Sequence, residues 1–525
     1  MLSTPPSQAD TEAPSATRRD SLPLWAAVPT GAAGGFALYV AFPSIAWWPM
    51  AFVGVGLGLA TLTGRRPGGA LLVGAVFGAA FHLAHLSWVG KFLGPLPWVA
   101  LSALQTVLFA LGAVAIAAVY RWARTRPGVR ARPWIAALAV ACVWTAREIL
   151  IGVWPYSGFP WARLGMSQVN GPFAEVASWV GVSGLSFFVA AVPALLVQAV
   201  PPRDISVRIV LAPGLLVIAA ALVPQFPTTD AGTLKIGWVQ ADGPTGYFDD
   251  ATTGEVLAAQ REATGQIAGQ DMDLLAWPEG GVDSDPLNDP ATAAALDEVS
   301  REVGAPLLVN AATQRGPLTY NTSLLWQPGV ATQLHDKRNP VPFGEYVPDR
   351  WFYRMIAPDL VDLIQREYTP GVLPPVVTVG GVNIGLAICF DVIYDDVIRE
   401  GAARGAEAFV FQTNNADFRG TDENLQQAAF ARMRAIESGR AVVNVSTVGT
   451  TQVFAPDGTV LAEAGPGVAA AETTEIVRRT GLTAGITLGP WLTLMVVIGA
   501  AVALGASMVT SRRTPLAQAQ IEDHE

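Results

Sequence analysis

The sequence predicts an α-helical bundle that crosses a membrane several times, joined to a layered α/β domain outside the cytoplasm. Three observations lead there: a hydrophobic composition, a series of long apolar stretches, and an alternation of β-prone and helical segments between the last two of them. Of 525 residues, 51% are hydrophobic and only 14% are charged, and the mean hydropathy is +0.37. Such values are typical of a membrane protein that carries a soluble domain.

Net charge and cysteine content exclude two classes of protein, nucleic-acid-binding proteins and disulfide-stabilised proteins. A net charge of −10 argues against a nucleic-acid-binding protein, which would need clustered basic residues. Cys142 and Cys389 lie far apart in unlike contexts, so no disulfide framework is expected. Cys142 falls in an apolar stretch and is expected to pack there. Cys389, in a water-facing domain, is a candidate nucleophile.

Residues 1–21 are rich in Pro, Ser, Thr and Ala and predict a disordered cytoplasmic tail. No cleavable signal is expected, because the apolar run that follows has no clear cleavage site. We expect seven membrane spans within residues 22–225, an eighth at 487–510 and a cytoplasmic tail at 511–525, since most of these stretches reach the roughly 20 residues that a bilayer requires. The apolar stretches lie at about 23–41, 44–62, 68–89, 97–120, 133–152, 172–200, 207–224 and 487–510.

Arginine and lysine residues set the predicted orientation. With the N-terminus inside, the inner loops hold 13 of these residues, whereas the short outer loops hold little more than Lys91 and Arg163. The positive-inside rule therefore places residues 226–486 outside the cytoplasm. The inner residues are Arg18, Arg19, Arg65, Arg66, Arg121, Arg124, Arg126, Arg130, Arg132, Arg203, Arg208, Arg512 and Arg513.

Residues 226–486 alternate β-prone runs with helical patterns, which predicts helices covering a mixed sheet. Asp457-Gly458, between Phe454 and Val460, is a hairpin signal. The expected strands are Leu234–Gln240, Leu274–Trp277, Pro306–Ala311, Ser323–Trp326, Ala331–Leu334, Val382–Ile388, Ala408–Gln412, Ala441–Val445 and Gln452–Phe454. The expected helices are 252–268, 291–303, 391–404 and 421–438.

Three residues of this domain come at the ends of β-prone runs: Glu279, Lys337 and Cys389. A residue at the end of a buried strand projects from the rim of a sheet, where α/β folds usually carry their chemistry. We therefore expect these three side chains to form one reaction centre.

The thiol needs assistance, because near its reference pKa of about 8.5 it is only slightly ionised at neutral pH. Glu279 is expected to take the thiol proton, Lys337 to stabilise thiolate and oxyanion, and Glu345 to hold the ammonium group. Backbone N–H groups just after Cys389 would add to an oxyanion hole. A Cys–His pair with His335 stays an alternative, although His335 and Lys337, two residues apart in a strand, would face the same way.

At these residues the chain resembles the nitrilase (carbon–nitrogen hydrolase) superfamily, whose Glu-Lys-Cys triad matches Glu279, Lys337 and Cys389. More narrowly, it resembles the apolipoprotein N-acyltransferase family. The resemblance covers nearly the whole chain and implies an α-β-β-α sandwich for the outer domain, in the bacterial plasma membrane. It also rests on the loop Ser157-Gly-Phe-Pro-Trp-Ala-Arg-Leu-Gly-Met-Ser-Gln, on Lys337–Pro348 with Glu345, and on Ala431-Arg-Met-Arg-Ala-Ile-Glu.

The resemblance implies a ping-pong acyl transfer. Cys389 attacks the ester of a membrane phospholipid and forms a thioester, and Glu279 protonates the leaving alkoxide. The α-amine of a diacylglyceryl-cysteine at a lipoprotein N-terminus then takes the acyl chain. No metal or other cofactor is expected, and we expect a monomer.

The chain departs from the family pattern at aromatic positions. Cys389 is followed by Phe390-Asp391 rather than Tyr-Glu, and Phe248 stands where a tryptophan is common. Asn414-Asn-Ala-Asp-Phe lacks the expected tryptophan. These changes affect aromatic contacts to lipid rather than the triad. Phe390 is taken as a supporting residue, and the candidate substrate-binding residues are Phe248, Tyr320, Asn321, Trp351 and Phe352.

Three further segments have expected roles. Residues 346–368 are rich in aromatic and aliphatic side chains and predict a lid or arm that rests on lipid or covers the acyl chain. The loop Val153–Gly165 is aromatic and almost uncharged, and is either an interfacial belt or part of a lipid entrance. His82 and His85 share a helix face without a third metal ligand, so they are expected to pack or to bond between helices.

Two other functions remain open from the sequence. A membrane-tethered amidase or nitrile hydrolase would need only a small polar pocket and not the apolar arm at 346–368. A non-catalytic scaffold for another membrane enzyme should tolerate the loss of the Cys389 thiol.

Overall fold

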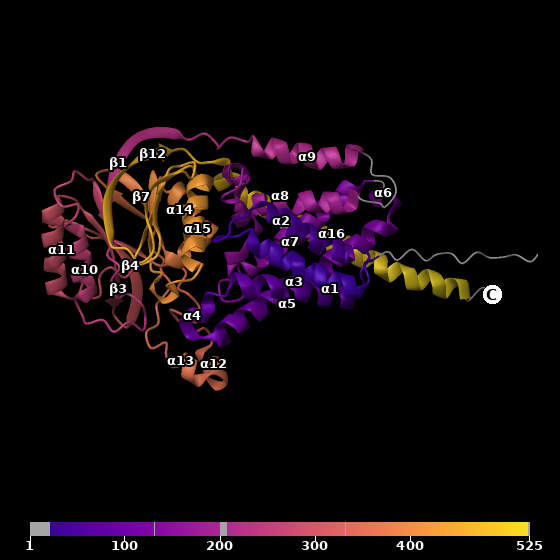
Figure 1. Ribbon diagram of the computed structural model, residues 1–525, viewed down its shortest axis with the longest axis horizontal. Coiled ribbons are helices and arrows are strands. Elements are labelled where there is room, and N and C mark those ends of the chain that lie inside the picture. The colour runs from indigo at the N-terminus through magenta and orange to yellow at the C-terminus, as the bar shows by residue number, and fades with distance from the viewer. Residues whose placement is uncertain (1–20, 131, 200–206, 331, 523–525) are drawn as a thin grey trace, which may run out of the picture.

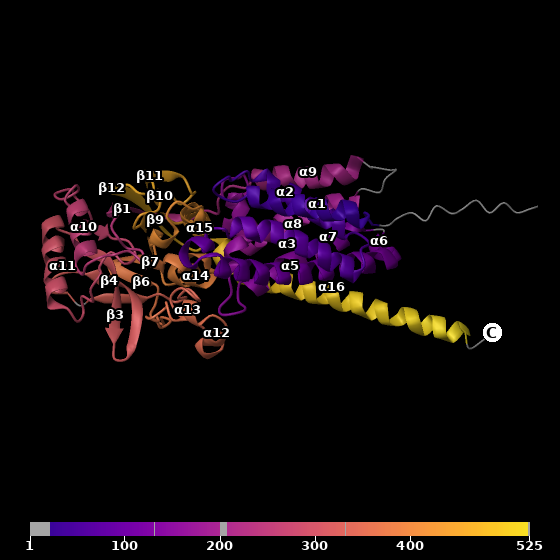
Figure 2. The ribbon, with the colours of Figure 1, turned by 60° about the horizontal axis from the view of Figure 1, so that its bottom comes forward.

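The computed structural model describes residues 21–130, 132–199, 207–330 and 332–522. The chain forms a helical bundle and a two-sheet domain that lie end to end (Figures 1 and 2). The expected tail at 1–21 and Arg203 fall almost wholly outside the described residues.

The bundle consists of apolar helices, five of which begin with proline. Proline suits this position because the first N–H groups of a helix have no partner in any case. The helices are α1 (Leu24–Val40), α2 (Pro49–Leu62), α3 (Pro67–His85), α4 (Val89–Leu93), α5 (Pro95–Thr125), α6 (Pro127–Arg130), α7 (Pro133–Ile151), α8 (Ala177–Ala199), α9 (Val207–Ala221) and α16 (Ala484–Glu522). Three short 3-10 turns, η1 (Pro160–Ala162), η2 (Leu164–Gln168) and η3 (Ala174–Val176), join α7 to α8.

Within the described residues, five helices are long and apolar enough to cross a membrane. They are Pro67–His85, Pro95–Thr125, Pro133–Ile151, Ala174–Gln198 and Ala484–Val509. The helices α1, α2 and α9 have 17, 14 and 15 residues, which is short for a bilayer. Five of the eight expected spans therefore have the necessary length and composition, and the other three stay predictions.

Glycines allow the first helices of the bundle to pack closely. A Cβ atom at Gly35 would lie 2.2 Å from the carbonyl oxygen of Phe77, and one at Gly54 would lie 2.6 Å from that of Gly34. No larger residue fits such contacts. Small residues serve this purpose in membranes, where water supplies no driving force for helix association.

The two-sheet domain has six strands in each sheet, counted over the described residues. In each sheet three parallel strands are flanked by antiparallel ones. The first sheet has the order β12 (Ala470–Thr480), β1 (Thr229–Gln240), β2 (Leu274–Ala276), β3 (Leu307–Arg315), β4 (Leu318–Trp326), β5 (Gln333–Asp336). The second has the order β11 (Val460–Ala464), β10 (Thr451–Phe454), β9 (Val442–Ser446), β8 (Ala408–Thr413), β7 (Val382–Ile388), β6 (Val376–Val379).

The sheets pack face to face and helices cover their outer faces. Side chains of both sheets, such as Ile236 and Val443, share one buried core, and α10 and α11 close a second core on the first sheet. Figure 1 shows the layers in sequence: α11 and α10, the two sheets, α14 and α15, and then the bundle. The helices are α10 (Glu255–Thr264), α11 (Pro290–Val303), α14 (Asp395–Ala403) and α15 (Glu423–Ser438). This is an α-β-β-α arrangement.

The expected strands are all present, and the hairpin at Asp457-Gly458 joins β10 to β11. Three strands are absent from the expected set, β6, β11 and β12, although the hairpin signal indicated the turn before β11. The strand β12 begins Ala-Ala-Glu-Thr-Thr-Glu and only two of its residues are buried, so it lacks the apolar run of a buried strand. The helix expected at 391–404 is wrong at its start, because Cys389–Ile393 forms the 3-10 turn η4 and α14 begins only at Asp395.

The bundle contacts the domain through the loop after α7 and through Trp88, which lies between α3 and α4. The indole Nε1 atoms of Trp161 and Trp88 donate to Oε1 of Gln426 on α15, at 2.6 and 3.2 Å. Arg163 pairs with Asp395 on α14 at 2.6 Å. Trp161 is only 2% exposed, so an interfacial-belt role is wrong for this residue, because its ring is covered by the domain. Trp154, at 55% exposure, can still contact lipid.

Candidate active site

Glu279, Lys337 and Cys389 reach one region because of how the strands run. β2 and β3 are parallel, and β5, antiparallel to β4, points the same way as β3. The ends of β2 and β5 therefore meet at one edge of the first sheet. Cys389 follows β7, the equivalent parallel strand of the second sheet. Ligand sites lie at such carboxyl ends in open α/β sheets.

Lys337 is held between two carboxylates. Its Nζ atom lies 3.0 Å from Oε1 of Glu279 and 2.9 Å from Oε1 of Glu345. Lys337 is 1% exposed and Glu279 is 6% exposed, so the ion pairs are shielded from water. Glu345 also accepts a hydrogen bond from the N–H of Val341 at 2.7 Å, which fixes the loop after Lys337.

A chain of amide side chains orients Glu279. The N–H of Gly280 donates to Oδ1 of Asn310 at 2.8 Å, so the Nδ2 group of Asn310 faces Oδ1 of Asn321, also at 2.8 Å. Because Oδ1 of Asn321 accepts from Asn310, its Nδ2 group donates to Oε1 of Glu279, at 2.7 Å. A backbone N–H thus determines that Glu279 meets donors only, which keeps its carboxylate an acceptor.

Cys389 lies at a sharp turn between strand and helix. Its φ is +47°, a left-handed conformation that costs a residue with a side chain of order 1 kcal/mol or more. The sulfur accepts a hydrogen bond from Nε2 of Gln427 at 3.2 Å. Asp391, in the same turn, accepts from the N–H groups of Arg338 and Asn339 at 3.1 and 2.8 Å, which ties the turn to the segment after Lys337.

Electrostatics show that these groups share one site. Burial and then the Glu279 carboxylate raise the pKa of Cys389 well above its usual range, whereas Lys337 lowers it. Burial alone would lower the pKa of Lys337, but Glu279 and Glu345 outweigh it and raise that pKa. Burial raises the pKa of Glu279 against the opposing effect of Lys337. These effects together favour the neutral form of the thiol.

The candidate substrate-binding residues are not all brought to the triad. Asn321 contacts Glu279 directly. Tyr320, its neighbour in β4, faces the other side of the strand, where Arg315 lies 3.9 Å over its ring. Phe248 packs 5.7 Å from Phe92 of the bundle, measured between ring centroids, and is 54% exposed.

The remaining aromatic candidates lie on two further elements. Trp351 and Phe352 belong to the exposed helix α12 (Arg350–Ile356), which α13 (Pro358–Val361) follows. Phe390 is buried, with its ring centroid 5.9 Å from Phe159 and 5.5 Å from Tyr394. It therefore supports the thiol turn from the side that packs on the bundle.

The alternative base is not supported. His335 is fully buried in β5, and neither ring nitrogen has a hydrogen-bond partner among the described residues. Burial lowers its pKa to about 4. His82 and His85 are buried within α3, and the described residues contain no cluster of three or more His, Cys, Asp or Glu that could hold a metal.

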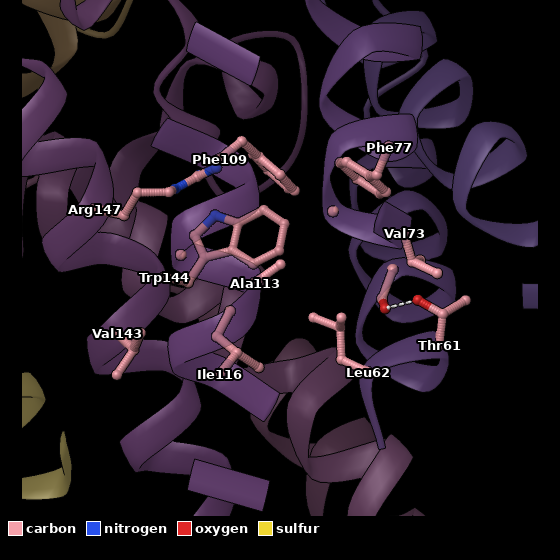
Figure 3. A pocket seen from close by; sticks show the side chains of 13 residues that line it. Thr61, Leu62, Val73, Phe77, Phe109, Ala113, Ile116, Val143, Trp144 and Arg147 are labelled. Atoms are coloured by element: carbon pink, nitrogen blue, oxygen red, sulfur yellow. Dashed lines mark hydrogen bonds between the residues drawn. The ribbon is translucent and has the colours of Figure 1, made fainter. Parts of the chain in front are cut away.

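A separate cavity lies inside the bundle (Figure 3). It measures about 360 Å³ including the space open to solvent, and it is lined by α2, α3, α5 and α7. Arg147 points toward Phe109, with its guanidinium carbon 4.2 Å above the ring. The lining includes no residue of the two-sheet domain, so this cavity is separate from the group formed by Glu279, Lys337 and Cys389.

Sequence reasoning missed Arg434, which braces the turn that carries Cys389. The guanidinium donates to the carbonyl oxygens of Val392 and Ile393 at 2.8 and 2.9 Å, and it pairs with Asp395 and Glu437 at 2.8 and 2.5 Å. It is 1% exposed. The sequence does mark this residue, because Arg434 lies in the motif Ala431-Arg-Met-Arg-Ala-Ile-Glu, on which the family resemblance rests.

Arg434→Met is expected to destabilise the protein by about 3–5 kcal/mol, because it leaves the buried Glu437 carboxylate without its cation. Thermal unfolding in detergent measures the loss. Arg404→Met is the matched control, since Arg404 forms an exposed pair with Glu400, and such pairs contribute little. Equal unfolding temperatures for the two variants would contradict the bracing role.

Comparisons with known proteins agree with this architecture. Residues 34–195 match the apolipoprotein N-acyltransferase N-terminal domain, and residues 235–479 match carbon-nitrogen hydrolase. An apolipoprotein N-acyltransferase of Mycolicibacterium smegmatis is 31% identical, over 94% of this chain and 86% of the relative. One of Vibrio parahaemolyticus is 24% identical, over 87% and 92%.

Two of the solved structures that are similar to this chain cover about half of it. An amidase from Nesterenkonia sp. is 20% identical, with a TM-score of 0.36, over 49% of this chain and 94% of its own. A CN-hydrolase superfamily protein from Xanthomonas campestris is 19% identical, with a TM-score of 0.34, over 46% and 90%.

Proposed function

The chain belongs to the apolipoprotein N-acyltransferase family, and we propose that it carries a fatty acyl chain from a membrane phospholipid, through a thioester on Cys389, to the N-terminal amine of lipoproteins. The amine is the α-amine of a diacylglyceryl-cysteine. The observation that supports this most is the grouping of Cys389 with Glu279 and Lys337 in the domain that packs on the membrane bundle.

In the first half-reaction, Glu279 takes the thiol proton as the sulfur attacks the ester carbonyl. The ammonium group of Lys337 donates one hydrogen bond to Glu279 and one to Glu345, so its third N–H is available to the oxyanion. When the carbon–oxygen bond breaks, Glu279 returns its proton to the alkoxide. A lysophospholipid leaves and the acyl group remains on sulfur.

In the second half-reaction, the lipoprotein amine attacks the thioester carbonyl and Glu279 accepts one proton of the amine. The carbon–sulfur bond then breaks, and the thiolate takes that proton back from Glu279. A thioester suits this step because a neutral amine attacks it readily. Exclusion of water keeps the enzyme from acting as a phospholipase.

The proposed topology has eight spans, with α1, α2 and α9 crossing beside the five longer helices, and with both termini in the cytoplasm of a bacterial plasma membrane. The arginine distribution supports the domain being outside. Within the bundle, Arg121 donates to the backbone oxygen of Arg65 at 2.7 Å, so two of the predicted inner loops lie together. Both lipid substrates would then reach the thiol from the outer leaflet.

The exposed face of α12 is proposed to rest on lipid. Trp351, Met355 and Ile356 are 71%, 68% and 64% exposed. Leaving such side chains in water is unfavourable by roughly 1.5–3 kcal/mol each relative to burial. A membrane surface or an acyl chain would cover them.

Replacing Trp351 and Ile356 together by serine is expected to raise the KM for phospholipid in vesicles by about tenfold or more, because the arm loses apolar area. Transfer kinetics with vesicle substrates measure this. The exposed residue Val372, which lies after the arm, provides the control Val372→Ser. An unchanged KM in the double variant would remove the arm from substrate binding.

Trapping the acyl-enzyme tests the proposal. The purified protein is incubated with phospholipid, and mass spectrometry should find one fatty acyl group on Cys389, released by hydroxylamine. Cys389→Ser should show no hydroxylamine-labile adduct. A folded wild-type protein that remains unacylated would contradict acyl transfer, and hydrolysis of small amides by that protein would favour a tethered amidase.

A further inference from the structure

A second chain of buried amides ends at the sulfur of Cys389. Gln427, on α15, is 2% exposed and directs its side chain toward Sγ, with Nε2 at 3.2 Å. The steps described above do not use this residue.

The direction of the chain follows from a backbone donor. The N–H of Gly449 donates to Oγ of Ser446 at 2.9 Å, so the hydroxyl proton of Ser446 is given to Oδ1 of Asn415, at 2.6 Å. Asn415 therefore presents Nδ2 to Oε1 of Gln427, at 2.7 Å. That leaves the Nε2 group of Gln427, a donor, facing Cys389.

A carboxyl group secures the same orientation. The second Nδ2 proton of Asn415 goes to Oε2 of Glu423 at 2.7 Å. Burial raises the pKa of Glu423 to about 8, and the carbonyl oxygen of the group accepts a hydrogen bond even when the carboxyl is protonated. A reversed Asn415 would set Oδ1 against the oxygens of Glu423 and Gln427, which disfavours the alternative.

We propose that Gln427 is a hydrogen-bond donor to the reacting sulfur, and that Asn415 and Ser446 are the positioning residues that aim it. This inference rests on the proposed role of Cys389 as nucleophile. A hydrogen bond to an ionised acceptor is roughly twice as strong as one between neutral groups. Gln427 therefore favours the thiolate both when it attacks the phospholipid and when the amine expels it.

Such a donor matters because the surroundings oppose the thiolate. Burial is the largest cause of the raised pKa of Cys389, and the carboxylates of Glu279, Glu423 and Glu345 add to it. These reach the sulfur from the end of β2, from α15 and from the loop after β5. Lys337 opposes them by charge, and Gln427 adds an uncharged donor on the side of α15.

The test is the pH dependence of Cys389 alkylation by iodoacetamide in the full-length protein, with the modified peptide measured by mass spectrometry so that Cys142 does not interfere. Gln427→Leu is expected to raise the apparent pKa of alkylation by about one unit and to slow it roughly tenfold below that pKa. Gln427→Glu, of nearly the same shape, is expected to raise it further, because an acceptor replaces the donor.

A packing role predicts the opposite order, with the isosteric Gln427→Glu milder than Gln427→Leu, and that order would overturn the proposal. So would an unchanged profile in Gln427→Leu. Gln260→Leu, a buried glutamine on α10, is the matched control and should leave the profile unchanged. If Gln427→Leu does not fold, Ser446→Ala takes its place, with a smaller rise expected and no rise counting against the proposal.

Alkylation of Cys389 needs no lipid, so the experiment tests the donor role of Gln427 independently of the proposed acyl transfer. A shifted profile together with an absent acyl-enzyme would retain the donor role and reject phospholipid as substrate. An acyl-enzyme together with an unshifted profile would do the reverse.

Discussion

Cys389→Ala is expected to lower acyl transfer by at least about 10⁴-fold, because no other group can form the covalent intermediate. Removing the nucleophile of a covalent enzyme costs about 10⁶-fold in a well-studied case. The measurement is transfer of a labelled acyl chain from phospholipid vesicles to a diacylglyceryl peptide. Phospholipid breakdown should stop as well, since both products arise after attack by sulfur.

Cys142→Ala is the control for this prediction. Cys142 lies in α7, where a Cβ atom at Gly499 of α16 would come within 2.8 Å of its sulfur. Its replacement by the smaller alanine is expected to leave transfer within about twofold of wild type. Retention of more than about 1% of transfer by Cys389→Ala would show that the thiol is not the acyl carrier.

Glu279→Gln is expected to reduce transfer by about 10²–10⁴-fold, the usual contribution of a general acid or base. Glutamine preserves the size of the side chain but cannot take the thiol proton. The loss should appear in both half-reactions, measured as slower acylation of Cys389 and slower discharge to the amine. Glu345→Gln should cost less, because Glu345 acts through Lys337.

The pH profile gives an independent test of the base. Glu279 must be ionised to act, so the rate falls as pH falls through its pKa. Burial raises that pKa from its ordinary 4.5, so the acid limb of kcat/KM should lie above pH 4.5 in wild type. The limb should vanish in Glu279→Gln. An acid limb that persists unchanged in this variant would assign it to another group.

Much of the architecture is visible in the sequence, because burial leaves a local pattern. Continuous apolar runs such as Val382–Ile388 and Ala408–Gln412 predict buried strands. These two runs match β7 and β8 to within a residue, whereas β1 and β4 begin five residues before their expected starts. The polar strand β12 was missed for the same reason, since it lies at a sheet edge and has no such run. The short helices α1 and α2 show that an apolar stretch alone does not fix the length of a helix.

The grouping of Glu279, Lys337 and Cys389 could also be predicted from the sequence, because each of these candidate residues follows a β-prone run and lies in a distinctive motif. The side chains that position these three residues could not be predicted from the sequence. From the sequence, Asn321 was expected only to bind substrate. No sequence pattern indicated Gln427, and Arg434 lies in a recognised motif but had no expected role. Their partners lie 42, 38 and 42 residues away, at Glu279, Cys389 and Val392.

The sequence by itself indicated the long apolar helices, the layered domain and the three candidate side chains, because hydrophobic period and residue chemistry are properties of short segments. The tertiary structure alone decided which way each amide points, how the loop around Trp161 covers the domain and why Cys389 adopts a left-handed turn. These features depend on donors and acceptors from separate elements meeting within about 3 Å, and local sequence patterns do not encode such meetings.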